Sequence, residues 1–116
     1  QDHTLRIDGV LSRREKFMGQ KVLIKGYLVE VYLCPKKAER CQPPHVWIAD
    51  TPAGSGKRLM VVNLEEKAVK ALKVGTQYVV TGQFASKSLD GFVRSSGLLV
   101  QEKFEEPTPP EPAPAP

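Results

Sequence analysis

The order of its strand-like and helical segments constrains the fold of this chain more than any other feature. Segments typical of strands occupy 21–33, 45–50, 58–63, 76–88 and 92–104. One short helical segment lies between the third and the fourth. The strand segments are rich in β-branched and aromatic residues, and turn sequences such as Asp90-Gly91 separate them. The β-β-β-α-β order predicts an all-β protein, a small five-stranded Greek-key barrel with its helix between strands three and four.

Three of the longer strand segments carry a glycine near their centre: Gly26, Gly82 and Gly97. A glycine inside a strand marks a bulge or a sharp bend. The 13-residue first segment is long for a strand, and a bend at Gly26 lets it serve two sides of a closed sheet.

The helical segment begins after Asn63, where Glu66 completes a capping-box pattern. An apolar stripe then predicts which face is buried, and Gly75 ends the helix. The stripe consists of Leu64, Ala68, Ala71 and Leu72.

The segment before the first strand is the least regular part of the domain. Leu5 and Ile7 alternate with charged residues, as a short lead-in strand would, and Asp8 is placed to cap a helical turn. Phe17 and Met18 are expected to plug one end of the barrel. Asp50, at the end of the second strand, is expected to cap the turn that follows it.

The chain divides into a domain at 1–104 and a proline-rich tail at 105–116. The last ten residues, PTPPEPAPAP, hold six of the ten prolines, which favours a solvated spacer or a frayed end over a packed segment. Residues 1–104 carry all 17 Lys and Arg against 10 Asp and Glu, a net charge of +7. Such a domain attracts polyanions, and the alternative is that the charge serves solubility.

Two cysteines bracket the segment CPKKAERC, as Cys34 and Cys41. A disulfide would close this short loop, and we take it as the favoured state. Two free thiols, or a zinc site completed by His3 and His45, are the alternatives. A disulfide implies a periplasmic or otherwise extracytoplasmic location.

The first residue is Gln1, which fits a mature exported form or an arbitrary start. A membrane anchor through a lipidated N-terminal cysteine, since removed, is one version of the exported form. No apolar stretch reaches the roughly 20 residues that a transmembrane helix needs.

Three phrases resemble the oligonucleotide/oligosaccharide-binding (OB) fold across about 5–104: GQKVLIKGYL at 19–28, VWIAD at 46–50 and KVGTQYVVTGQF at 73–84. Anticodon-binding domains and small extracytoplasmic bacterial proteins both carry such phrases. The cysteine loop departs from the cytosolic, anticodon-binding pattern and favours the extracytoplasmic relatives. The resemblance implies a ligand across strands two and three, between the 34–44 loop and 86–92.

On this chain the implied surface has an aromatic and apolar part and a cationic part. The first comprises His45, Trp47, Ala49, Met60 and Val62; the second comprises Lys36, Lys37, Arg40, Lys57, Arg58, Lys87 and Arg94. Trp47 would stack a base or a sugar ring, unless it faces the core or is covered by the 34–44 loop. The first and last groups of cations are expected at one rim of the barrel, with a solvated charged surface as the alternative.

Catalytic chemistry has little support in the sequence. GSGKR at 54–58 is no phosphate loop, because Thr51 stands where the motif needs glycine and Arg58 where it needs Ser or Thr. No paired carboxylates, nucleophile elbow or cofactor motif is evident. The sequence thus favours a non-enzymatic, exported barrel that binds a protein or an anionic polymer, such as an acidic glycan, at the cell envelope. A single-stranded nucleic-acid-binding module using Trp47 and the basic rim is the alternative, and a purely structural subunit is a third.

Overall fold

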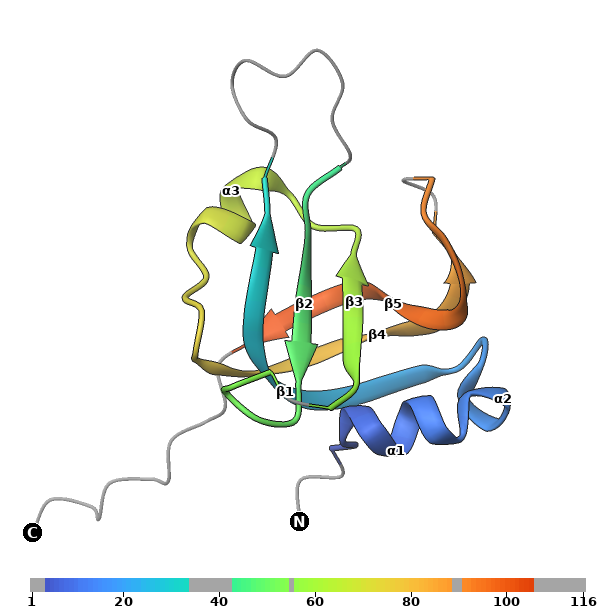
Figure 1. The fold of residues 1–116 in the computed structure, drawn as a ribbon. Coiled ribbons are helices and arrows are strands. Elements are labelled where there is room, and N and C mark those ends of the chain that lie inside the picture. The colour runs from blue at the N-terminus through green and yellow to red at the C-terminus, as the bar shows by residue number, and fades with distance from the viewer. Residues whose placement is uncertain (1–3, 34–42, 55, 89–90, 106–116) are drawn as a thin grey trace, which may run out of the picture.

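The computed structural model describes residues 4–33, 43–54, 56–88 and 91–105. Five strands close a barrel in the order β1-β2-β3-β5-β4 (Figure 1). They are β1 (Lys21–Tyr32), β2 (His45–Ala49), β3 (Arg58–Val62), β4 (Gln77–Lys87) and β5 (Val93–Glu105). Three short helices accompany them: α1 (Ile7–Ser12), α2 (Arg14–Phe17) and α3 (Glu66–Lys70). The predicted all-β barrel with its helix between β3 and β4 is confirmed.

Strand β1 serves two sides of the barrel, as its length suggested. Its first half, to Tyr27, pairs with β4, and its second half, from Tyr27, pairs with β2. The register runs unbroken through Gly26, and the irregularity falls between Leu28 and Glu30 instead. Gly26 allows α1 and β2 to pack closely on β1, since a Cβ there would lie 2.6 Å from Cδ1 of Ile7 and 3.2 Å from the carbonyl oxygen of Ala49.

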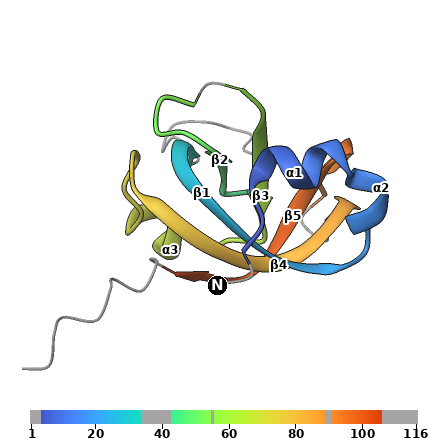
Figure 2. The same ribbon diagram turned by 90° about the horizontal axis from the view of Figure 1, so that it is seen from below.

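The barrel interior is filled by the inward-facing residues of every strand, which alternate with outward-facing ones. Helix α1 adds two fully buried side chains, so it belongs to the core and closes one end of the barrel (Figures 1 and 2). The largest fully buried members of this cluster are Ile7, Ile24, Leu28, Ile48, Leu59, Phe84 and Leu99. Phe17 and Met18 are partly buried and pack against this cluster, as expected of residues that plug one end of the barrel.

Asp50 fixes the start of α1, a role different from the expected one. Its two carboxylate oxygens accept hydrogen bonds from the backbone N–H groups of Ile7 (2.8 Å) and Asp8 (3.0 Å). These N–H groups have no partner within the helix, so the carboxylate satisfies them and complements the helix dipole. The prediction that Asp50 serves the following turn overlooked this partner 43 positions earlier. Asp8 is therefore in the first turn of α1 rather than its cap.

Helix α3 is shorter than predicted, and its capping box is absent. The N-cap is Glu65, without a side-chain cap, while Asn63 adopts φ 66° and its side-chain amide donates to the carbonyl of Gln101 (3.0 Å). Leu64 and Val69 are buried. Ala68, within the helix, and Ala71, its C-cap, are exposed, so these two members of the predicted stripe do not face the core.

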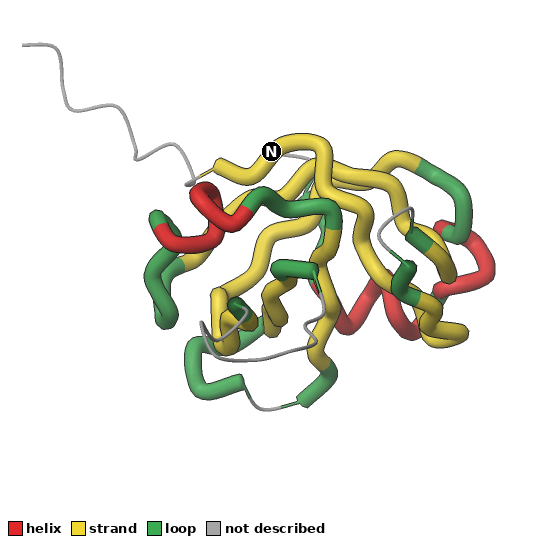
Figure 3. The backbone as a smooth tube through the Cα atoms, turned by 90° about the horizontal axis from the view of Figure 1, so that it is seen from above, coloured by secondary structure: helices red, strands yellow, loops and turns green. Residues whose placement is uncertain are grey.

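The glycines of β4 and β5 lie where the barrel bends. The β4–β5 register shifts between Thr81 and Gly82, as a bulge there predicts. Gly97 has φ 106°, and a Cβ there would overlap the Phe84 ring. The tube view shows the strands curving around the barrel (Figure 3). None of the helices in the described part of the chain is long and apolar enough to span a membrane.

Candidate functional site

A second apolar cluster lies on the outside of the barrel, over β2, β3 and β5. Its members alternate with the core residues of the same strands, and Trp47 stands opposite Met60 in the β2–β3 register. The cluster comprises Met60, Val62, Phe92 and Leu98, with Trp47, Ala85 and Val100 packed against them. The end of the β4–β5 hairpin rises beside β3 (Figure 1). Met60, Val62, Phe92 and Leu98 are buried, so they form a small second core under this outer face.

Trp47 is half-buried and packs against this second apolar cluster, not in the barrel core. The guanidinium carbon of Arg94 lies 4.9 Å from the centroid of its ring. This geometry is a cation–π contact, and it places a positive charge directly beside the aromatic surface. The alternative in which Trp47 faces the core is therefore wrong.

His45 lies inside the molecule rather than on the surface. Its side chain is 4% exposed, its ring stacks on Tyr32 at 4.7 Å, and Phe92 meets it edge-on at 5.0 Å. Its Nδ1 is 3.0 Å from the carbonyl oxygen of Pro43. His45 is therefore a packing residue, and its expected place on the ligand surface is not supported by this burial.

Four cations from separate segments surround one hollow of about 270 Å³ beside the outer face. They come from α2, from the start of β3 and its approach, and from β5, and the lining residues are Leu11, Arg14, Lys57, Arg58 and Arg94. Since Arg94 also covers Trp47, the aromatic residue and the hollow adjoin. The arrangement places several positive charges next to one aromatic ring.

Two of these cations are held by neighbours. Lys57 donates to the Ser12 hydroxyl (3.1 Å) and lies 3.7 Å from a carboxylate oxygen of Asp8. Arg58 donates through Nε to the carbonyl of Gly54 (3.2 Å). The contacts of Lys57 tie α1 to the segment that leads into β3.

The structure regroups the cations predicted from the sequence. Lys57, Arg58 and Arg94 come together, and Lys87 pairs with Val93 across the hairpin without lining the hollow. The predicted residues Lys36, Lys37 and Arg40 lie outside the described residues, as do Cys34 and Cys41. The expected shared rim of the first and last groups therefore stays a prediction.

Arg14 was missed by sequence reasoning. It stands in the basic run SRREK before Phe17, which was not among the predicted cation groups. Within the described ranges, no three His, Cys, Asp or Glu side chains cluster as a metal site requires.

No protein-family model matches the chain, and no curated protein matches it significantly. Two solved structures of asparaginyl-tRNA synthetase from Pyrococcus horikoshii are similar in fold. One, complexed with asparaginyl-adenylate, has a TM-score of 0.59 at 16% identity over 91% of this chain and 22% of that chain. The other has a TM-score of 0.50 at 18% identity over 78% of this chain and 20% of that one. The chain thus spans about a fifth of their length, and the likeness, with the closed barrel, supports the OB fold.

Proposed function

We propose that this protein binds single-stranded nucleic acid across the outer face of β2, β3 and β5. The observation that carries the proposal is the contact of Arg94 with Trp47 at the edge of a hollow lined by further cations. An aromatic ring stacks a base, and cations beside it hold the phosphates. The protein is an OB-fold binding module, and we propose that it acts by binding rather than by catalysis.

The outer face suits unstacked bases better than a smooth polyanion. Trp47 packs against the buried Met60, Val62 and Leu98 and leaves part of its ring exposed, and bases, unlike sulfate or carboxylate groups, gain from stacking on such a ring. Stacking on one aromatic side chain is worth about 1–3 kcal/mol per base. The net charge of +7 over 1–104 adds attraction that is independent of sequence.

The solved structures of similar fold offer limited support. They belong to an enzyme whose name gives tRNA as its substrate, so one use of this architecture is in a protein that handles nucleic acid. At 16% identity the likeness concerns the fold, and the proposal rests on the residues of this chain.

A titration with fluorescein-labelled oligothymidylate tests the proposal. We expect the binding constant to fall with salt, with a log–log slope of about −0.7 for each phosphate contacted, and Trp47 fluorescence to be quenched. Heparin and a duplex of the same length serve as controls. Equal binding of all three without quenching, or no binding to the single strand at about 0.05 M salt, contradicts the proposal.

An exported module that binds an anionic polymer or a protein at a cell envelope is the second candidate. The pair Cys34 and Cys41 favours it, because a disulfide persists in an oxidising compartment. Thiol counting on unreduced, denatured protein from its native source checks this candidate. Two free thiols would count against export, whereas a bridged pair together with heparin binding stronger than oligothymidylate binding would favour it.

A further inference from the structure

We propose that α1 and α2 form a second phosphate-binding surface, continuous with the hollow beside Trp47, along which a single strand extends past the barrel. The inference rests on the proposed function and adds to it the path of the ligand. A nucleic-acid strand with one base stacked on Trp47 would pass Arg14 and then reach the other cations of the two helices.

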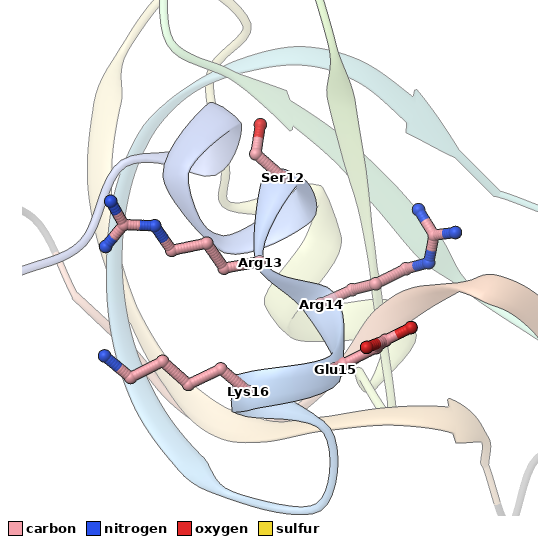
Figure 4. Close-up of a pocket in the computed structure, with 5 residues that line it drawn as sticks. All are labelled: Ser12, Arg13, Arg14, Glu15 and Lys16. Atoms are coloured by element: carbon pink, nitrogen blue, oxygen red, sulfur yellow. The ribbon is translucent and has the colours of Figure 1, made fainter.

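The end of α1 and the whole of α2 present three cations and one carboxylate. They surround a hollow of about 410 Å³ lined by Ser12, Arg13, Arg14, Glu15 and Lys16. Figure 4 shows Arg13 and Lys16 projecting to one side of the helices and Arg14 to the other. The backbone at Arg13 (φ −120°, ψ 36°) ends α1 and begins α2, which sends two successive arginines in opposite directions.

Arg14 joins this hollow to the one beside Trp47, because it lines both. A third hollow, of about 480 Å³, shares Ser12 and Arg13 with the second and continues to Arg6. The cations thus run from Arg94 to Arg14 on one side of the helices and continue with Arg13 and Lys16 on the other side. A chain of phosphates that passes around the helices is the ligand that matches such separate positive charges.

The helices are held by the barrel at both ends. Asp50 fixes the first turn of α1, and Val10 is fully buried. After α2, the N–H of Gly19 donates to the carbonyl of Phe84 (2.6 Å), and the N–H of Phe84 donates to that of Gln20 (2.9 Å). A surface held in this way loses little conformational entropy when it binds.

Glu15 lines the same hollow, but the ion pairs found among the described residues do not include the cations of this surface. Ion pairs in the described residues join Lys21 to Glu102, Lys57 to Asp8, Lys70 to Glu66 and Lys103 to Glu105. In that part of the chain none involves Arg13, Arg14 or Lys16. A ligand phosphate would therefore replace water and counterions there, and no internal ion pair would have to break.

The test compares short and long oligothymidylates, of about 4 and about 16 nucleotides, the limits of the site sizes known for OB folds. The variant is Arg13→Ser with Lys16→Ser. Its control is Lys67→Ser with Lys73→Ser, which removes the same charge around α3, on the far side of the barrel (Figures 1 and 3).

We expect the Arg13/Lys16 variant to lose most of the extra affinity of the long strand and to reduce its salt slope by about 1.4, two contacts of 0.7 each. Binding of the short strand and quenching of Trp47 should stay within about twofold of the unaltered protein. Equal losses for both lengths, or an equal loss in the α3 control, would overturn the inference while leaving the proposed function in place. Absence of binding to both lengths by the unaltered protein would overturn both.

Discussion

Trp47 and Arg94 act as one unit at the scale of single residues, because the charge of one lies 4.9 Å from the ring centre of the other. The sequence placed both on the candidate surface but gave no reason to pair them, since they are 47 positions apart. The parity of Trp47 with His45 was visible in β2. The burial of His45 between two rings was not, because Tyr32 and Phe92 come from other parts of the chain.

Trp47→Ala should weaken binding of oligothymidylate by roughly 5- to 150-fold, the equivalent of about 1–3 kcal/mol of stacking. The salt slope should stay unchanged because no cation is removed. Trp47→Phe, which keeps an aromatic ring, should recover much of the affinity. Fluorescence anisotropy with a labelled strand measures both. A changed slope with unchanged affinity would speak against a stacking role.

Arg94→Lys separates the charge of Arg94 from its planar contact with the indole. Lysine keeps the positive charge but covers the ring less well, so acrylamide should quench Trp47 more strongly in the free protein. The salt slope for oligothymidylate should be retained in Arg94→Lys and should fall by about 0.7 in Arg94→Ala. Quenching that is the same in all three proteins would show that Arg94 does not cover Trp47 in solution.

At the scale of elements, the strands followed from local pattern and the helices depended on distant contacts. Alternation and turn residues located all five strands to within about two residues. The start of α1 was less accessible, because its cap comes from Asp50, 42 and 43 positions away. For α3, the capping box predicted from Asn63 and Glu66 does not form, and the Asn63 side chain donates to the carbonyl of Gln101 instead. Neither of these distant partners could be identified from the local sequence.

Asp50→Ala should lower the free energy of unfolding by about 1–2 kcal/mol, the usual cost of losing a helix cap. Asp50→Asn should lose less, since its amide oxygen still accepts one of the two N–H groups. Glu65→Ala is the matched control, because Glu65 is the N-cap of α3 and makes no side-chain cap bond. Urea unfolding followed by Trp47 fluorescence measures all three. Equal effects of the Asp50 and Glu65 changes to alanine would contradict the assigned cap.

Gly97→Ala should destabilise the protein more than Gly75→Ala. Both glycines have positive φ, 106° and 93°, so alanine strains the backbone by about 1–2 kcal/mol at either position. Only at Gly97 would the new methyl group meet the fully buried Phe84 ring, which adds about 1–3 kcal/mol, whereas Gly75 faces open space. Urea unfolding of the two variants gives the difference. Equal losses would mean that β5 bends away from Phe84 at no cost.

At the scale of the whole molecule, the barrel could be predicted from the order of the strand segments, because a closed barrel buries the apolar face of every strand at once. The parallel pairing of β3 with β5 closes it, at Val61 opposite Leu99. The candidate site was less accessible to prediction, since its hollow combines α2, β3 and β5. Charge counts indicate that a polyanion is attracted. Only the three-dimensional arrangement indicates which of the cations stand together.

Removal of 106–116 should leave the stability of the barrel unchanged to within about 0.5 kcal/mol, because β5 completes its pairing with β4 at Val79 and Glu105. The truncation also removes Glu106 and Glu111, raising the net charge from +4 to +6, with 17 basic against 11 acidic residues. Affinity for oligothymidylate should therefore rise slightly at low salt and converge with that of the full chain as salt screens the charges.

Full-length protein with Glu106→Gln and Glu111→Gln is the control, and it should show the same rise if charge alone is responsible. Urea unfolding and salt-dependent anisotropy measure the two effects. A loss of stability above about 1 kcal/mol on truncation, absent from the glutamine variant, would show that the proline-rich segment packs on the barrel and is no spacer.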